Sequence, residues 1–348
     1  MDFKISASDY AKLIDLFGRV SGTLEPSYRY FQIYYKRGLK FFASDGCMKL
    51  EFSSGVATSP FNGVYTVPID YARALKSSDP TSLIFFSAGE EDLELRTASE
   101  TLTLQKARSS TLPAMERKFE FFSRFPLKEF SSSLNFVSSA SVEGETVEIF
   151  SKKNETVLAA SANRMVLVSV LEYEPKTEFR YSLQYVTVRH LVKALELLTS
   201  EELYAGTGIS ELGLKIGPLL FSICTDEADF SEPPSFFFGD IDDGNDVQRK
   251  AFLSALRKIT RLSKHGFSVL MISDKSKLKF FLKAGALRYE CEVCDFVGDE
   301  FVAQVDPRKL QSVISRIKDS KIRLVTRKGN LLMVGRKSKM YLMVPLIR

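Results

Sequence analysis

The sequence predicts an α+β protein made of three repeated domains, each with two helices packed on antiparallel sheets. The first observation behind this prediction is that Val67, Val186 and Val305 are evenly spaced and each precedes an amphipathic segment. The same spacing relates five further sets of apolar residues: Leu75, Ala194 and Val313; Ile84, Leu203 and Ile322; Leu93, Leu212 and Leu331; Leu102, Phe221 and Met340; Leu104, Ile223 and Leu342. A repeat this long corresponds to a whole small domain rather than to a solenoid unit.

Each repeat begins with a predicted helix whose apolar residues lie at i, i+4 and i+7, the spacing of one helix face. These residues are Leu13, Phe17 and Val20; Phe130, Leu134 and Val137; Phe252, Leu256 and Ile259. Ser8 with Asp9, Pro126, and Asn245 with Asp246 are typical of helix starts. A second helix follows in each repeat, and Pro68 and Pro307 suit a first helical turn. The predicted helical segments are 8–20, 68–78, 126–140, 187–199, 246–264 and 306–319.

Short alternating or apolar runs between the helices predict strands. They are 31–35, 39–42, 146–150 and 267–271, and they end at the predicted turns Asp45-Gly46, Lys153-Asn154 and Ser273-Asp274. We expect the domain boundaries near Pro113–Lys118 and Pro233–Asp240. The predicted domains are therefore residues 1–117, 118–238 and 239–348.

Length and composition agree with a globular protein that stays inside the cell. The 348 residues are 45% apolar and 26% charged, which is ordinary for packed domains. The start Met1-Asp2-Phe3-Lys4 lacks the basic region of a signal peptide, and no run approaches the roughly 20 apolar residues of a membrane helix. We therefore expect a cytoplasmic protein without membrane contacts.

No motif indicates catalysis, a cofactor or a metal. The sequence contains no phosphate-binding glycine loop, dinucleotide fingerprint or nucleophile elbow, and its two histidines leave little for acid–base chemistry. Cys291 and Cys294 form an isolated C-x-x-C in an alternating run that should send the sulfurs to opposite faces. The acidic run 240–243 has its glycine one position too early for a calcium loop, so a linker is the favoured interpretation. We expect no enzyme activity.

The positive charge of the chain is concentrated in the predicted helices. Their combined net charge exceeds the +5 of the whole chain, so the remainder is negative. Charged outer faces are common on helices, but this segregation of sign favours contact with the phosphates of a nucleic acid, without base recognition. The candidate phosphate contacts are Arg73, Lys76, Arg189, Lys193, Lys250, Arg257, Arg308 and Arg316.

Several segments resemble the bacterial sliding clamp, the beta subunit of DNA polymerase III, and the resemblance extends over essentially the whole chain. The segments are 67–75 (VPIDYARAL), 110–114 (STLPA), 160–165 (ASANRM), 253–258 (LSALRK) with 261–263 (RLS), and 341–348 (YLMVPLIR). The resemblance implies three domains of the DNA-clamp fold in a crescent, with two crescents closing head-to-tail into a homodimeric ring around duplex DNA. The strand expected at the ring interface is 101–108.

The resemblance also implies a DNA polymerase processivity factor that is not an enzyme. Its partners would be a replicative DNA polymerase and a clamp loader, which dock through short linear peptides. One wall of the implied peptide pocket is Ala160, Asn163, Arg164 and Met165, and the other is Phe236, Met343, Val344, Pro345 and Leu346. The alternative is a clamp-like paralogue that acts as a peptide-binding scaffold without a stable ring.

Overall fold

The computed structural model describes residues 1–22, 26–75, 79–89, 91–105, 108–109, 119–152, 155–162, 164–173, 177–226, 241, 243–262, 268–274 and 276–347. These residues divide into two compact units. Unit 1 contains Met1–Leu127 and Arg189–Asp226, and unit 2 contains Lys128–Val188 and Glu227–Arg348. The predicted domain boundaries at 117/118 and 238/239 lie outside the described residues and stay predictions.

The observed helices match the predicted segments in place, and all but α1, which begins one residue earlier than predicted, are shorter. They are α1 (Ala7–Val20), α2 (Ile69–Ala74), α3 (Leu127–Val137), α4 (Tyr185–Leu195), α5 (Arg249–Leu262) and α6 (Pro307–Arg316), with the 3₁₀ turns η1 (Pro26–Tyr28) and η2 (Ser138–Ala140). The Ser6 hydroxyl accepts a hydrogen bond from the Asp9 backbone N–H at 3.1 Å and caps α1. At α6, the Asp306 carboxylate accepts from the backbone N–H groups of Arg308 and Lys309.

Three predicted helix starts are wrong. Pro126 is the last residue of a strand, and α3 begins at Leu127. Asn245 and Asp246 belong to a strand, and α5 begins only at Arg249. Asp246 is held in that strand by the Arg323 guanidinium, which donates a 2.8 Å hydrogen bond to its carboxylate. Pro68 precedes α2 as the N-cap residue rather than lying in its first turn.

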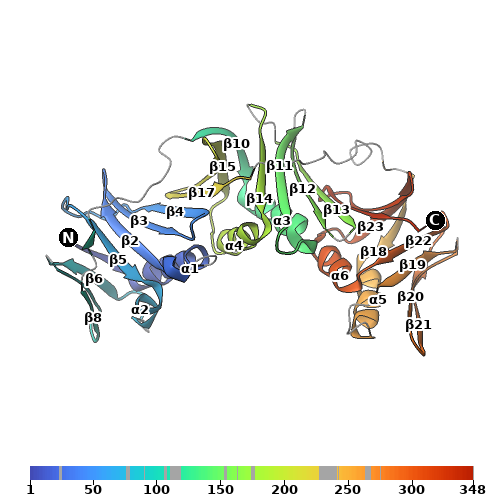
Figure 1. The fold of residues 1–348 in the computed structure, drawn as a ribbon, viewed down its shortest axis with the longest axis horizontal. Coiled ribbons are helices and arrows are strands. Elements are labelled where there is room, and N and C mark those ends of the chain that lie inside the picture. The colour runs from blue at the N-terminus through green and yellow to red at the C-terminus, as the bar shows by residue number, and fades with distance from the viewer. Residues whose placement is uncertain are drawn as a thin grey trace. The chain divides into compact units, whose positions relative to one another are not determined.

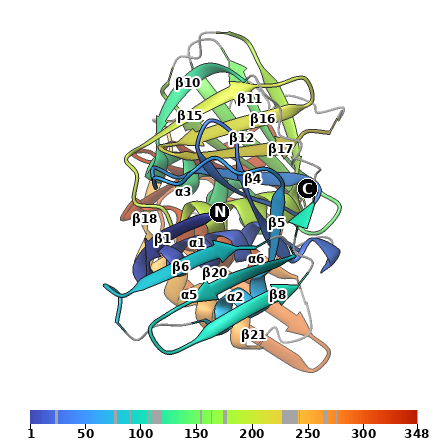
Figure 2. The same ribbon diagram turned by 90° about the vertical axis from the view of Figure 1, so that its left-hand side faces the viewer.

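The strands of unit 1 form two antiparallel sheets, ordered β1-β6-β7-β8 and β10-β15-β16-β17-β4-β3-β2-β5-β9. Figure 2 shows the first sheet with β8 as its outermost strand. The bounds are β1 (Asp2–Ser6), β2 (Tyr30–Tyr35), β3 (Leu39–Ser44), β4 (Met48–Ser53), β5 (Val64–Pro68), β6 (Leu83–Ala88), β7 (Asp92–Arg96), β8 (Thr101–Gln105), β9 (Arg108–Ser109), β10 (Glu120–Pro126), β15 (Glu202–Thr207), β16 (Glu211–Ile216) and β17 (Leu219–Cys224).

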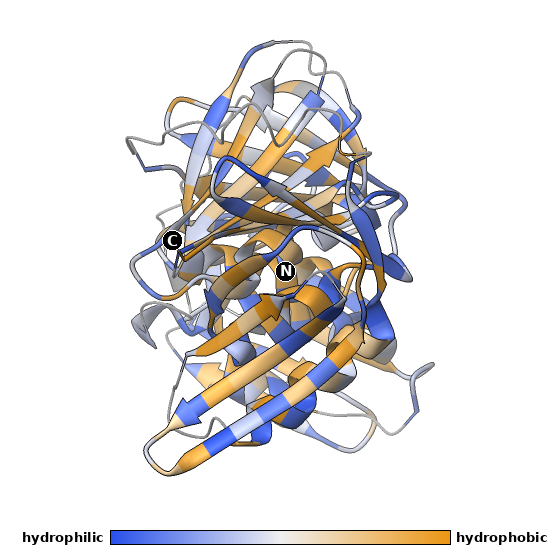
Figure 3. Ribbon diagram, turned by 90° about the vertical axis from the view of Figure 1, so that its right-hand side faces the viewer, coloured by the Kyte–Doolittle hydropathy of each residue, from blue (hydrophilic) through white to orange (hydrophobic). Residues whose placement is uncertain are grey.

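Unit 2 also has two antiparallel sheets, ordered β14-β11-β12-β13-β25-β24-β23-β18 and β21-β20-β19-β22. In Figure 3 hydrophilic and hydrophobic residues alternate along the hairpin of β20 and β21, and β21 is an edge strand. The bounds are β11 (Thr146–Lys152), β12 (Glu155–Ala162), β13 (Met165–Leu171), β14 (Arg180–Gln184), β18 (Asn245–Gln248), β19 (Val269–Ser273), β20 (Lys277–Ala284), β21 (Leu287–Asp295), β22 (Phe301–Val305), β23 (Lys321–Arg327), β24 (Asn330–Gly335) and β25 (Met340–Pro345).

The strand pairing repeats three times along the chain. The order β1-β6-β7-β8 recurs as β10-β15-β16-β17 and as β18-β23-β24-β25. The order β5-β2-β3-β4 recurs as β14-β11-β12-β13 and as β22-β19-β20-β21. The α+β prediction with antiparallel sheets is therefore confirmed, and the topology repeats with the apolar register of the sequence.

Burial explains why that register recurs. Most residues of the six sets form the cores of the sheets; for example, Ile84, Leu203 and Ile322 are each 0% exposed. The exceptions are Val186, and Leu102 and Leu104 on β8, which are half-buried. Their counterparts on β17 and β25 are buried because both of those strands have a neighbour on each side.

Two strand pairs join consecutive repeats, and we call them junctions. Junction A pairs β4 with β17 in unit 1, with Leu50 opposite Phe221. Junction B pairs β13 with β25 in unit 2, with Ser169 opposite Met340. Each junction therefore extends a sheet from one repeat into the next by ordinary antiparallel hydrogen bonding.

Candidate nucleic-acid interface and peptide pocket

The most basic helix, α5, presents its charges to solvent. Phe252, Leu256 and Ile259 are fully buried on one face, which leaves Lys250 and Arg257 exposed on the other. Helix α6 contacts α5, and both lie on the same side of the sheets of unit 2 in Figure 1. Unit 2 therefore brings the basic residues of two helices onto one surface.

The two candidate arginines of α6 differ in environment. Arg308 is exposed at the first turn of the helix. Arg316 is half-buried, and its guanidinium donates to the Asn135 side-chain oxygen at 2.7 Å and to the Ser312 backbone oxygen at 2.8 Å. Arg316 thus connects α6 to α3, which leaves less of its hydrogen-bonding capacity for a phosphate.

In unit 1 the described candidate residues lie on two helices, α2 and α4. Arg189 on α4 is exposed and Lys193 is half-buried, while Arg73 on α2 is half-buried against Gly18 of α1. A side chain at Gly18 would collide with the Arg73 guanidinium, so glycine permits this close approach. Lys76 lies outside the described residues.

The pKa of His190 reflects the positive charges around α4. Its pKa is lowered chiefly by burial, and further by the positive charges of Lys193, Arg189 and Arg19. Arg19 is exposed near the end of α1, and the sequence prediction did not include it. Its position as the last basic residue of an amphipathic helix could have identified it. The exposed Lys258 and Arg261 of α5 were likewise missing from the candidates.

The candidate peptide pocket lies at one end of junction B, where Val166 of β13 pairs with Met343 of β25. Its residues divide into two groups by exposure. Ala160, Met165 and Val344 are buried, whereas Arg164, Met343, Pro345 and Leu346 are exposed or half-buried. Asn163 and Phe236 lie outside the described residues.

Arg164 has an unusual backbone conformation. Its φ is 62°, in the left-handed region that non-glycine residues seldom adopt. It occupies the turn before β13, and its side chain is exposed. Leu346 is fixed on the other side, because its backbone N–H donates to the Gly329 oxygen at 2.9 Å. The arrangement can present one cationic and several apolar side chains to a ligand.

The C-x-x-C prediction needs a correction. A bulge in β21 shifts the register, so Cys294 pairs with Leu278 and Cys291 with Phe280. Leu278 and Phe280 share one face of β20, so both cysteines lie on that face rather than on opposite ones. Among the described residues no group of three His, Cys, Asp or Glu side chains is placed to hold a metal. No helix in the same residues is long and apolar enough to span a membrane.

Comparison with solved structures gives full-length matches. The DNA polymerase III beta subunit of Thermotoga maritima aligns with a TM-score of 0.84 at 15% identity, covering 100% of this chain and 99% of that one. A DNA polymerase sliding clamp of Pseudomonas aeruginosa, solved with a ligand, aligns with a TM-score of 0.84 at 15% identity, covering 100% of both chains. The DNA polymerase beta subunit of Streptococcus pyogenes aligns with a TM-score of 0.83 at 13% identity, covering 100% of both chains.

The sequence comparisons are negative. No protein-family model matches the chain, and no curated protein matches it in sequence. At identities this low the structural matches establish the fold. The chain has the fold of the bacterial sliding clamps, as the sequence resemblance implied.

Proposed function

We propose that this protein is a DNA polymerase processivity factor: a non-catalytic sliding clamp that encircles duplex DNA as a head-to-tail homodimer in the cytoplasm. Three repeats, in domains near 1–117, 118–238 and 239–348, would follow one another around each half of the ring. One observation carries the proposal: within the residues that the structure describes, β8 and β21 each lack the neighbouring strand that the repeating order gives to their counterparts.

The repeat specifies what these edges would bind. In junction A, β17 pairs with β4, and in junction B the corresponding strands β25 and β13 pair in the same way. The repeat counterpart of β17 and β25 is β8, and the counterpart of β4 and β13 is β21. In the described part of the chain neither β8 nor β21 has a neighbouring strand on its outer side. Pairing β21 of one subunit with β8 of another would complete the series and close a ring.

The exposure of β8 supports this pairing. Leu102 and Leu104 are half-buried, while their counterparts on β17 and β25 are buried by the neighbouring strand. Exposed strand edges with apolar side chains tend to pair with another chain. A partner strand on β8 would bury these two leucines as β4 buries Phe221.

A closed ring gives weak phosphate contacts a function. The candidate contacts on the helices bind without sequence preference and exchange rapidly in salt. Topological linkage would keep the protein on DNA while those contacts permit sliding. Arg73, Arg189, Lys193, Lys250, Arg257 and Arg308 remain our proposed contacts, joined by Arg19 and Arg261, with Arg316 in a supporting position.

The pocket at the end of junction B would tether the polymerase and the clamp loader through short linear peptides. Its half-buried Met343 and Leu346 and its exposed Pro345 offer apolar contacts, and Arg164 offers a positive charge to a peptide carboxylate. The buried Ala160, Met165 and Val344 would form the floor beneath them.

The experiment that tests this function compares retention on circular and linearised duplex DNA after loading with a clamp loader. A ring stays on circular DNA and slides off free ends, so we expect long retention only on the circle. Equal retention on both forms would contradict encirclement.

The alternative function is a peptide-binding scaffold without a stable ring. The bulge in β21 favours it, because a bulge disrupts regular pairing along an edge. Sedimentation separates the two functions, since a scaffold of this kind would remain monomeric at micromolar concentration.

A further inference from the structure

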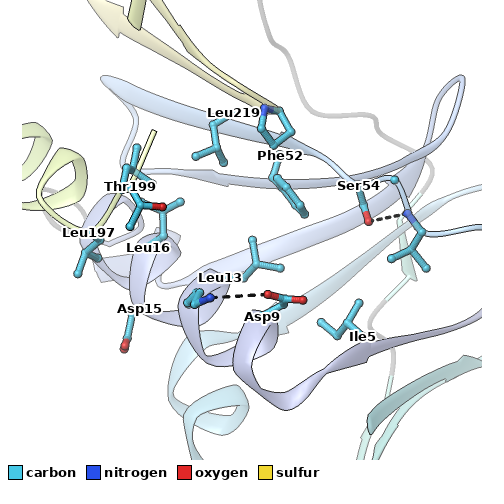
Figure 4. A pocket seen from close by; sticks show the side chains of 15 residues that line it. Ile5, Asp9, Leu13, Asp15, Leu16, Phe52, Ser54, Leu197, Thr199 and Leu219 are labelled. Atoms are coloured by element: carbon cyan, nitrogen blue, oxygen red, sulfur yellow. Dashed lines mark hydrogen bonds and ion pairs between the residues drawn. The ribbon is translucent and has the colours of Figure 1, made fainter. Parts of the chain in front are cut away.

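The strongest unexplained feature is an apolar hollow in unit 1, at the end of junction A that faces α1. Its volume is about 490 Å³, within the range of ligand-binding pockets. Four segments far apart in the sequence line it: β1 with α1, the end of β4 and the residues after it, the turn after α4, and the hairpin between β16 and β17. The lining residues include Ile5, Leu13, Leu16, Phe52, Leu197 and Leu219 (Figure 4).

The fold does not require this hollow to be apolar. A hollow of about 510 Å³ occupies the corresponding place in junction B and is lined by α3, the end of β13, Lys318 after α6, and the hairpin between β24 and β25. By the spacing of the repeat, Pro218 and Leu219 correspond to Lys337 and Ser338.

Two further pairs of equivalent lining positions differ in polarity, whereas Phe52 and its counterpart Leu171 are both apolar. Leu16 on α1 corresponds to Ser133 on α3, and Thr199 corresponds to Lys318. Both members of each pair line their respective hollows. Leu16 and Leu219 are thus replaced by serines in junction B, and Pro218 and Thr199 by lysines, so the more apolar lining of junction A is particular to that junction.

The mouth of the hollow has an excess of negative charge. Asp9 and Asp15 lie on its lining. Lys12 is the only basic residue in the described part of the lining, and its nitrogen lies 3.9 Å from the Asp9 carboxylate. Glu196 and Glu201 are exposed on the segment that supplies Leu197. This acidic surface contrasts with a chain whose net charge is +5.

These charges restrict the ligand. Nucleic acids and fatty acids carry negative charge, which the acidic mouth would repel. Apolar side chains would be buried against the leucines and Phe52, while a neighbouring lysine or arginine would face Asp9 and Asp15. Leu197, 44% exposed at the rim, would lose that exposure on binding.

We propose that this hollow is a second docking site, which binds a short peptide with two or three apolar side chains flanked by basic residues. It lies in unit 1, whereas the candidate peptide pocket lies in unit 2, and it does not depend on ring closure. The two sites would allow one chain to hold two partners with different peptide chemistries.

The test uses the full-length protein and a fluorescent peptide of sequence Lys-Leu-Phe-Leu-Lys, with a glutamate-flanked analogue as the charge control. Fluorescence anisotropy should show that the basic peptide binds and that the acidic analogue binds about tenfold more weakly, as expected for the loss of a favourable charge contact. Leu197→Gln and Leu13→Gln should each weaken binding of the basic peptide by about tenfold or more, because each removes an apolar contact of the lining without adding charge.

Matched variants make the result specific. Leu262→Gln changes a leucine at the end of α5 that is 39% exposed, close to the 44% of Leu197, and should leave the affinity unchanged. Met343→Gln, in the candidate peptide pocket, should also leave it unchanged. Thermal melting of each variant establishes that it is folded. Equal binding of the two peptides, unchanged affinity in the Leu13 and Leu197 variants, or loss of binding only in Met343→Gln would each overturn the proposal.

Discussion

Junctions A and B have the same strand geometry but different surface chemistry. Both join two repeats by an antiparallel strand pair, β4 with β17 and β13 with β25. At one end, junction A has Cys47 opposite Cys224, whereas junction B has Val166 opposite Met343 beside the exposed Arg164. At the other end, junction A has an apolar hollow and junction B a charged one.

This comparison separates what folding requires from what binding requires. Most buried residues of the junctions keep their apolar character, as Phe221 and Met340 illustrate. Leu50 is an exception, because its counterpart in junction B is the buried Ser169, whose hydroxyl donates a 2.9 Å hydrogen bond to Ser133. The surface residues at the ends of the strands diverge freely, because their contribution to the packed cores is small. Divergence between equivalent positions of one chain therefore marks the surfaces that are candidates for specific contacts.

The largest expected effect concerns the buried strand positions. Phe221→Ala should lower the free energy of unfolding by about 3–5 kcal/mol, because it leaves a cavity in a fully buried site. Urea denaturation followed by circular dichroism measures this. Leu102→Ala, the repeat counterpart on β8, should instead weaken dimerisation by about tenfold, as expected when one leucine loses its apolar contacts. An equal loss of unfolding free energy for both variants would contradict the idea that β8 is an assembly surface.

The second prediction concerns the basic helices. Lys250→Glu combined with Arg257→Glu should shorten retention on circular DNA and reduce the slope of log retention against log salt by about two, because roughly 0.9 counterions are released per phosphate contact. Lys4→Glu and Lys283→Glu reverse two exposed charges on strands β1 and β20 and serve as the control. If the strand variant loses as much retention as the helix variant, the helices are not the DNA-facing surface.

The third prediction sharpens the difference between the two junctions. Met343→Gln should weaken the binding of a polymerase-derived peptide by about tenfold, since the half-buried methionine supplies an apolar contact. Cys224→Gln changes the corresponding position in junction A and should have no effect on the same peptide. Isothermal titration calorimetry gives both affinities, and similar losses in the two variants would place the peptide elsewhere.

The smallest expected effect is a pH dependence in unit 1. Burial and nearby positive charges lower the pKa of His190, so its neutral form is favoured in the folded protein. The folded state therefore resists protonation more than the unfolded state, and stability falls as the pH drops below the usual histidine pKa of about 6.5. His190→Gln should flatten the melting temperature between about pH 5 and pH 7. A profile identical to that of the unsubstituted protein would show that His190 contributes nothing.

Much of the fold could be predicted because the residues that repeat at a fixed spacing are buried core residues. Ile84, Leu203 and Ile322 recur at one spacing since each fills the same place in a core. The start of α5 was predicted too early because β18 is a short strand with polar residues, and its pairing with β23 depends on residues far along the chain.

The candidate sites were less predictable, because they depend on contacts between residues far apart in the sequence. Arg316 has the sequence signature of a surface arginine, but its partner Asn135 lies on another helix and no local pattern indicates the contact. The bulge in β21 likewise places Cys291 and Cys294 on one face of the strand, and the alternation of residues in the sequence does not indicate this bulge. The apolar hollow combines residues of four separate segments, each of which resembles ordinary core in isolation.

The most direct test of the central claim is sedimentation velocity of the full chain at micromolar concentration, beside a Leu102→Asp variant. If β8 and β21 complete a third junction between subunits, the protein should sediment with twice the 39.2 kDa mass of one chain, and the variant should sediment as a monomer. A monomeric unsubstituted protein, or a dimer that Leu102→Asp leaves intact, would contradict the account.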